Sequence, residues 1–327
     1  MVNFNKIEIE KPSKYIHTNR RRTHFFEVYL IMLHGIIDIG SNTIRLNVYR
    51  VEDEKVNVVV SKKEILGLIS YVKKGKLTGK GVKKLVTDLK EMKDLLDLLN
   101  IESYHFFATA SLRNIKNSAE VTQIIRDRVG IEVDVLSSEE EGELSFYGSL
   151  ATIKEDDGIL FDLGGGSVEL VLFQDKKITE KRSIPVGSLK MFDEYVSQMI
   201  PTREEGEQIK ERVHQELEKT GLKETIPYMC GVGGALRAVK HLLVDLELKK
   251  PKEDLMDVKL LKQLETELKH NDKPTYNKIL HVKPARIHTL VPALLITDEL
   301  TTYFGCEKLQ VSKYSIREGY LYRKVLK

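Results

Sequence analysis

The chain has 327 residues, of which 41% are hydrophobic and 31% are charged, and its formal net charge is +3. This length exceeds one ordinary domain, so the composition predicts a globular protein of two domains. The small net charge gives no support for a nucleic-acid-binding protein, and the sequence has no long uncharged apolar run that would insert into a membrane. Cys230 and Cys306 lie far apart, which fits a reducing cytoplasm and gives no metal-ligand spacing.

Residues 1–31 differ from the rest of the chain. They combine a basic run, Arg20–Arg22, with little periodicity, and no small-residue cleavage site follows their apolar part, which disfavours secretion. We predict a disordered extension, with Met32 as the natural start. A functional basic arm is the alternative.

Alternating apolar residues predict strands over 44–51 and 56–60. Six lysines and three glycines between Lys73 and Lys84 then predict a flexible cationic loop, which either attracts a polyanion or is simply solvated. Apolar residues spaced three and four apart from Val82 to Leu99 predict a core-facing helix.

An internal repeat dominates the sequence. Residues 38–46 (DIGSNTIRL) align without a gap on residues 162–170 (DLGGGSVEL). Each copy predicts a hairpin with a tight acidic and glycine-rich turn, and the second turn has Gly164, Gly165 and Gly166 in succession. Because backbone N–H groups of such a turn can point into one concavity, two facing copies would hold a chain of phosphates or a hydrated cation.

A strand near residues 104–108 leads into small and hydroxylated residues. Thr109 or Ser111 is predicted to cap the next helix, which would place Arg113 near that helix's N-terminus. There Arg113 either pairs with phosphate oxygens or is an ordinary surface arginine.

Acidic residues follow the strand predicted over 131–136. Ser138 and Glu141 have the spacing of a capping box, which is a structural explanation for the glutamates. The segment precedes the second hairpin by one helix, however, and so can lie where the two halves meet.

A third glycine-rich stretch, Gly231-Val232-Gly233-Gly234, follows an apolar strand. It offers a close approach for an anion but is not a dinucleotide fingerprint, because the third glycine is misplaced. An apolar helix over 287–304 and a strand over 308–312 follow, and Ser315 opens the final helix.

Together these segments resemble the exopolyphosphatase and guanosine-pentaphosphate phosphohydrolase family. The resemblance extends over nearly everything from Ile36 to Tyr322 and rests on six motifs in order: 38–42, 108–113, 138–141, 162–169, 231–234 and 315–319. It implies an α/β fold of two ribonuclease-H-like domains from the actin and sugar-kinase-like superfamily, with the active site in the cleft between them. We expect the domains to cover 32–152 and 153–327, with the final helix against the first.

The resemblance also implies roles for individual residues. Glu141 would be the base that activates water, or Glu140 if the register slips by one. Asp38, Asp162 and Glu169 would hold Mg²⁺. The expected phosphate-binding residues are Ser41, Asn42, Arg113, Gly164, Gly165, Gly166, Ser167, Gly231, Gly233 and Gly234.

Some residues depart from the family pattern. Val232 and Ala235 stand where threonines are usual, and His288 stands where an acidic residue is common, which weakens the case for nucleotide recognition. The sequence also lacks the C-terminal helical domains of longer members, so a long enclosed channel is not expected. A cytoplasmic, Mg²⁺-dependent hydrolase of inorganic polyphosphate is predicted, with guanosine pentaphosphate as a further substrate. The alternative functions are a phosphotransferase or ATPase and a non-catalytic sensor of polyphosphate or of an alarmone. Assembly as a homodimer is left open.

Overall fold

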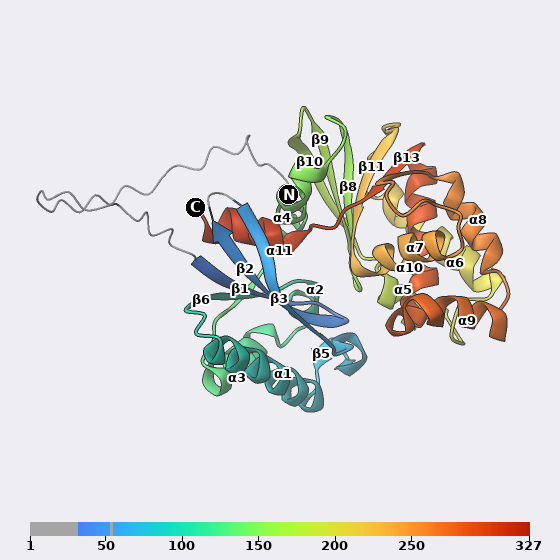
Figure 1. Cartoon of the computed structure of the whole chain (residues 1–327). Helices are drawn as coiled ribbons and strands as arrows, with labels where there is room; N and C mark the ends of the chain where they lie inside the picture. Colours follow the sequence, from blue (N-terminus) through green and yellow to red (C-terminus); the bar gives the residue numbers. More distant parts are fainter. Residues whose placement is uncertain (1–31, 53–54) are drawn as a thin grey trace, which may run out of the picture.

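The computed structural model describes residues 32–52 and 55–327, so the predictions made for residues 1–31 lie outside the described residues. Two α/β lobes lie side by side (Figure 1), each built on one sheet. The first sheet has the order β3-β2-β1-β6-β7. Its strands are β1 (Met32–Ile39), β2 (Thr43–Glu52), β3 (Lys55–Ile65), β6 (Ser103–Ala108) and β7 (Val133–Val135).

The second sheet repeats this arrangement. Its strand order is β10-β9-β8-β11-β13-β12, and β12 (Leu255–Asp257) is an added antiparallel edge strand. In both sheets the first three strands form an antiparallel meander and the next two run parallel to its first strand. The prediction of two ribonuclease-H-like halves is thereby confirmed. The other strands are β8 (Gly158–Leu163), β9 (Val168–Gln174), β10 (Lys177–Ile184), β11 (Tyr228–Val232) and β13 (Lys308–Val311).

In the first lobe, α1 (Gly79–Leu98) and α3 (Ser118–Val129) pack their apolar faces into a shared core with the sheet. The prediction of a flexible loop between Lys73 and Lys84 is wrong. After the short helix η1 (Leu68–Tyr71), β4 (Val72–Lys73) and β5 (Lys76–Leu77) form a hairpin, and α1 starts at Gly79 because the side chain of Thr78 accepts a hydrogen bond from Gly81 N.

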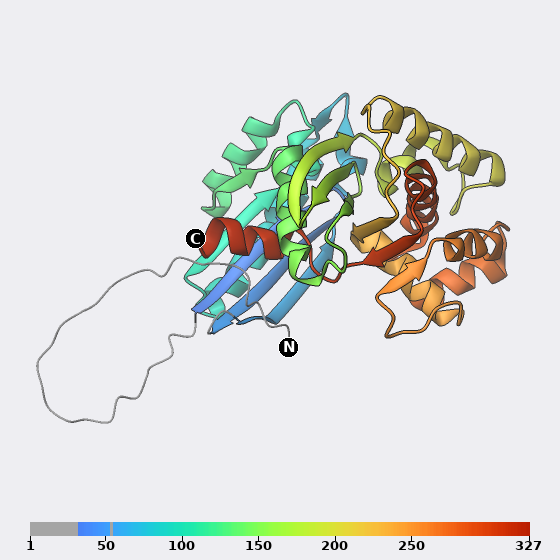
Figure 2. The same ribbon diagram turned by 90° about the horizontal axis from the view of Figure 1, so that it is seen from above.

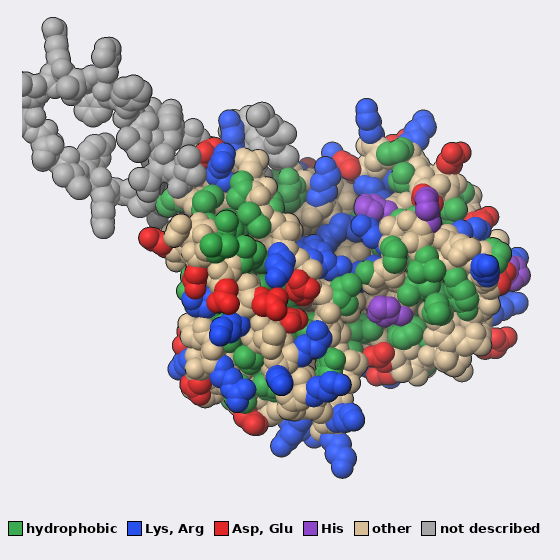
Figure 3. Space-filling view, turned by 60° about the horizontal axis from the view of Figure 1, so that its bottom comes forward, with side chains coloured by type: hydrophobic (Ala, Val, Ile, Leu, Met, Phe, Trp, Pro, Cys, Tyr) green, Lys and Arg blue, Asp and Glu red, His purple; other side chains and the backbone are tan. Residues whose placement is uncertain are grey.

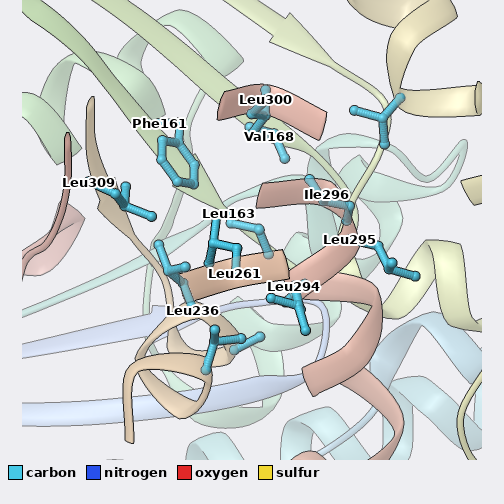
Figure 4. Close-up of a cluster of buried hydrophobic side chains, with 14 of the residues drawn as sticks. Phe161, Leu163, Val168, Leu236, Leu261, Leu294, Leu295, Ile296, Leu300 and Leu309 are labelled. Atoms are coloured by element: carbon cyan, nitrogen blue, oxygen red, sulfur yellow. The ribbon is translucent and has the colours of Figure 1, made fainter. Parts of the chain in front are cut away.

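Helices of the second lobe enclose a larger core. Figure 4 shows side chains from β8, β9, β13, α7, α8 and α10 meeting there. Long apolar runs explain this packing, since α10 is buried along most of its length although it carries Pro292. The helices are α5 (Ser188–Tyr195), α6 (Arg203–Glu218), α7 (Gly234–Asp245), α8 (Lys259–Glu267), α9 (Lys273–Val282), η3 (Pro284–Arg286) and α10 (Ile287–Tyr303).

Two helices join the lobes. α4 (Ser138–Ser149) crosses the final helix α11 (Ile316–Tyr320), which lies against the first sheet (Figure 2). Gly148 and Gly319 allow this crossing, because a Cβ on either residue would overlap the backbone of the other helix. The predicted domain boundary at residue 152 falls in η2 (Leu150–Thr152), directly after α4.

In the described part of the chain, no single helix has the length and apolar character to cross a membrane. α9 and η3–α10 meet that criterion only as a pair, and the pair is bent by 113°. Cys230 and Cys306 are free and buried, and burial raises the pKa of each thiol to about 12.

Candidate active site

The two repeated turns face each other across a cavity of about 120 Å³ between the lobes. Their backbones match, since Gly40 N donates to Thr43 O at 3.0 Å and Gly164 N donates to Ser167 O at 3.0 Å. Figure 3 shows a hollow between the lobes with Lys and Arg side chains inside it. The repeat found in the sequence is therefore one site built from two halves.

The Gly164–Gly166 turn is held from behind by the start of α5. Ser188 N donates to Gly164 O, and Leu189 N and Lys190 N donate to Gly165 O. Among the described residues, none accepts a backbone hydrogen bond from the N–H groups of Gly165 or Gly166, which both line the cavity. With its carbonyls fixed and these donors free, the turn is suited to an anion.

Several residues predicted to bind phosphate line this cavity: Ser41, Asn42, Gly164, Gly165, Gly166, Ser167, Gly233 and Gly234. The predicted role of Gly231 does not fit its position, because it lies inside β11, where a Cβ would collide with Leu236 and Phe161. Val232 is buried and Ala235 lines the cavity. His288 packs its ring on Phe192 instead of facing the cavity.

The capping box of α4 differs by one residue from the prediction. Ser137, not Ser138, is the N-cap, and its partner is Glu140, not Glu141. Glu140 also bonds to Lys324 Nζ at 3.0 Å, so its carboxylate is used at the surface and it does not fit the fallback role of base. This register turns Glu141 inward, where it is buried and lines the cavity.

Glu141 lies beside the guanidinium of Arg113 and near a second carboxylate, that of Glu169. Arg113 Nη1 donates to Glu141 Oε2 at 2.7 Å, and Arg113 Nη2 lies 3.6 Å from Glu169 Oε1. Burial, and then the charge of Glu169, raise the pKa of Glu141 well above its ordinary value, while Arg113 opposes the rise. A carboxylate with a raised pKa, in reach of a cavity, can accept a proton near neutral pH.

Arg113 is not placed as predicted. It is the last residue of the four-residue helix α2 (Ala110–Arg113), and it bonds to Glu141 and to Leu136 O behind the cavity wall. Thr109 occupies the predicted N-cap position, but its side chain makes no capping bond, and Ser111 Oγ donates to Ile39 O instead. Arg113 therefore holds Glu141 from behind and is not among the residues that line the cavity.

Of the three predicted metal ligands, Asp38 and Asp162 line the cavity. Glu169 lies behind the wall with 1% of its surface exposed, and Ser167 and Ser183 donate to its Oε1. Burial and the charges of Asp162 raise the pKa of Glu169 to about 7. A direct metal contact does not fit this position.

Within the described ranges, the carboxylates of Asp38 and Asp162 each accept one side-chain hydrogen bond. Arg317 Nη1 donates to Asp38 Oδ2 at 2.8 Å, and Ser145 Oγ donates to Asp162 Oδ2. Burial first, and Asp38 among the nearby charges, raise the pKa of Asp162. Within residues 32–52 and 55–327, no three His, Cys, Asp or Glu side chains are grouped as a metal site. Two carboxylates still fit Mg²⁺, which commonly takes one or two of them together with water and phosphate oxygens.

Four arginines that we did not predict as site residues line the cavity: Arg45, Arg237, Arg286 and Arg317. Burial lowers the pKa of Arg237 and of Arg286 to about 10, and Arg45 contributes in both cases. Arg237 Nη1 and Arg317 Nε are buried without a hydrogen-bond partner among the described residues. Buried donors of this kind favour an anionic ligand with several oxygens.

Signals for two of these arginines were present in the sequence. Arg45 occupies the repeat position of Glu169, and Arg317 lies in the 315–319 motif. Arg286 reaches the site only because Gly234 has no side chain, since a Cβ there would lie 2.5 Å from Arg286 Nη2. Sequence spacing gives no indication of that contact.

A family model described as the Ppx/GppA phosphatase family matches residues 47–327. The chain belongs to this family. Among solved structures, the Ppx/GppA family member from Aquifex aeolicus is 26% identical, with a TM-score of 0.75 over 90% of this chain and 98% of that one. The expected two-domain actin-like fold is thus confirmed.

Curated relatives of the Ppx/GppA chain include a bifunctional 3-dehydroquinate synthase/phosphatase from Fusobacterium nucleatum. It is 25% identical over 303 residues, which cover 86% of this chain and 45% of that protein. Exopolyphosphatase 1 of Mycobacterium bovis is 28% identical over 173 residues, which cover 52% of this chain and 50% of that protein. These matches extend over about half the length of each relative.

Proposed function

We propose that this chain is a phosphoanhydride hydrolase that releases the terminal phosphate of inorganic polyphosphate, with water as the nucleophile. The observation that carries the proposal is the position of Glu141. Its buried carboxylate is held by Arg113 at the wall of a cavity that lies between two matching turns. The relative named exopolyphosphatase 1 supports polyphosphate as the substrate class.

The terminal phosphate would bind between the turns. Free N–H groups of Gly165 and Gly166 would donate to its oxygens from one side, and Ser41 and Asn42 would do so from the other. The arginines of the cavity would neutralise the next phosphates of the chain. Because phosphoryl transfer depends on placement and charge neutralisation, this arrangement supplies most of what the reaction needs.

Asp38 and Asp162 would hold Mg²⁺ together with phosphate oxygens. When bound, the ion would neutralise charge that develops on the phosphoryl oxygens. Arg317 orients Asp38, and Ser145 fixes one oxygen of Asp162. Among the described residues, no side chain donates a hydrogen bond to the other carboxylate oxygen of either aspartate, so that oxygen is available to a ligand.

Glu141 would remove a proton from the attacking water. The water oxygen forms a bond to the terminal phosphorus as the bond from phosphorus to the bridging oxygen breaks. The proton passes to Glu141, the bridging oxygen leaves with the shortened chain, and Glu141 then returns its proton to solvent. No covalent enzyme intermediate is required.

The test is phosphate release with Mg²⁺ from tripolyphosphate, long-chain polyphosphate, guanosine pentaphosphate and ATP, by wild type and Glu141→Gln. We expect polyphosphate cleavage that falls about a hundredfold or more in Glu141→Gln, with binding retained. Glu139→Gln is the matched control, because Glu139 is an exposed residue in the same helical turn. Equal loss in both variants would contradict the role of Glu141.

Other outcomes distinguish the other candidates. ATP turnover without polyphosphate cleavage would indicate an ATPase or phosphotransferase. Tight binding of polyphosphate or of guanosine pentaphosphate without any turnover would indicate a sensor. One observation supports guanosine pentaphosphate as a second substrate: the cavity has four arginines, which can contact more than one phosphate group. Its cleavage in the same assay decides this point.

A further inference from the structure

An unpaired group of lysines lies on the first lobe outside the cavity. Lys73, Lys74 and Lys76 lie in the β4–β5 hairpin, and the exposed Lys116 packs beside it; we call these four residues the lysine hairpin. The sequence from Ile65 to Thr87 contains no Asp or Glu. Among the described residues, no carboxylate forms an ion pair with any lysine of this group. Figure 3 shows Lys and Arg side chains gathered along the bottom of this lobe as well as in the hollow.

The turn of this hairpin is unusual for its sequence. Lys74 and Gly75 have φ values of 51° and 76°, so both central residues of the two-residue turn are left-handed. Asn-Gly is the common choice for such a turn, and a lysine in this conformation costs backbone strain. Lys73 and Lys76 pair directly across the turn. This strained turn therefore places three lysines, Lys73, Lys74 and Lys76, at one tip.

The lysine hairpin is tied to the first phosphate turn by the backbone. Leu66 N and Gly67 N both donate to Asn42 O, and Ile69 N donates to Ser41 O. The hairpin follows this anchored segment immediately. On its other side, Lys116 N donates to Gly75 O at 2.7 Å, three residues after Arg113. The hairpin is therefore anchored next to a segment that is bonded to two cavity residues, Ser41 and Asn42, instead of lying on a free loop.

We propose that the lysine hairpin binds the part of a long polyphosphate chain that lies outside the cavity. This inference rests on the proposed function. A cavity of about 120 Å³ is small for a polymer, so the remainder of a long chain must leave it along a surface. Each further phosphate carries negative charge, and these lysines have no competing carboxylate partner. The hairpin thereby sets a preference for long chains over short ones.

The test variant is Lys73→Gln/Lys74→Asn/Lys76→Gln. Asn at position 74 suits the left-handed turn, so the hairpin is expected to fold. The control variant, Lys223→Gln/Lys259→Gln/Lys262→Gln, removes the same charge from exposed lysines of the second lobe. Thermal unfolding and circular dichroism confirm that both variants are folded before kinetics are measured.

Kinetics on two substrates separate the hairpin from the active site. We expect KM for long-chain polyphosphate to rise about fivefold or more in the test variant, since exposed pairs contribute a few-fold each. KM and kcat for tripolyphosphate should stay unchanged, as should both parameters on both substrates in the control. The salt dependence of log(kcat/KM) for the long chain should also become shallower, by up to about one unit of slope per lysine.

The remaining outcomes distinguish a failure of this inference from a failure of the proposed function. If tripolyphosphate is cleaved but KM for long chains does not change in the test variant, the lysine hairpin is not a polyphosphate site and the proposed function stands. If neither substrate is cleaved by wild type, the proposed function fails and the inference fails with it. If RNA competes with long-chain polyphosphate more strongly than unlabelled polyphosphate does, the hairpin is a nucleic-acid site and the inference is overturned.

Discussion

Arg113 Nη1 lies 2.7 Å from Glu141 Oε2, and the same guanidinium places Nη2 3.6 Å from Glu169 Oε1. One cation thus contacts two buried carboxylates from different elements, Glu141 from the connecting helix α4 and Glu169 from β9 of the second sheet. Burial raises the pKa of both carboxyl groups, and Arg113 lowers both. Arg113 therefore lowers the pH at which Glu141 becomes a base, against the larger effect of burial.

Arg113→Gln should move the acid limb of the pH profile upward. Without the cation, the pKa of Glu141 rises further, so kcat should reach half its maximum at a pH about one unit higher than in wild type. Arg113→Lys should shift the profile less, because the charge remains. Hydrolysis measured from pH 5 to 9 checks this. A uniform loss of kcat with an unmoved midpoint would show that Arg113 does not act through Glu141.

Glu169→Gln should stabilise the protein at alkaline pH. The pKa of Glu169 is about 7 in the folded protein and near 4.5 when unfolded, so the folded state binds more protons between these values. Stability contributed by this group is therefore lost as pH rises from about 4.5 through 7. We expect the melting temperature of Glu169→Gln to exceed that of wild type by a few degrees at pH 8 and to match it at pH 4.5.

Thermal unfolding at the two pH values tests this, with Glu139→Gln as the exposed control. An equal change of melting temperature at both pH values would mean that packing, and not ionisation, is responsible.

Among single substitutions in the cavity, Asp162→Asn should weaken Mg²⁺ binding most. We expect chelation of divalent ions to abolish phosphate release by wild type and Mg²⁺ to restore it. In Asp162→Asn, activity should fall on the order of a hundredfold and need more Mg²⁺. Ser145→Ala should show a smaller shift of the same kind, because Ser145 only orients Asp162. Full activity in the presence of a chelator would contradict the proposed metal.

Gly148→Ala should destabilise the join between the lobes. Its new methyl group would overlap Ser315 O at the crossing of α4 and α11, so we expect a loss of about 2–4 kcal/mol in the free energy of unfolding. Gly79→Ala is the control, because a Cβ at Gly79 meets nothing within 4 Å and alanine favours the helix. Chemical denaturation compares the two. Similar stability for both variants would show that α4 and α11 can separate without cost.

The sequence identified the two turns and Glu141, which line the cavity, and it failed in specific places. Its prediction of the capping box was off by one because Ser137 and Ser138 both precede a run of three glutamates, so spacing alone allows two registers. The lysine-rich stretch was predicted as a loop because glycine and lysine disfavour strands. Pairing of Val72 with Leu77 overrides that preference.

The conformation of the two turns is determined by the residues within each turn. Each needs only its own Asp, Gly and hydroxyl residues to close the bond from the glycine N–H to the residue three positions on, so the aligned repeat was enough to predict both halves of the site. Tertiary structure alone decided the charges around them. Asp38 meets Arg317 across 279 residues, and Arg286 reaches the cavity over Gly234, because these contacts depend on how α4, α11 and the two sheets pack. A long-range ion pair leaves no periodic signal in a sequence, whereas a tight turn does.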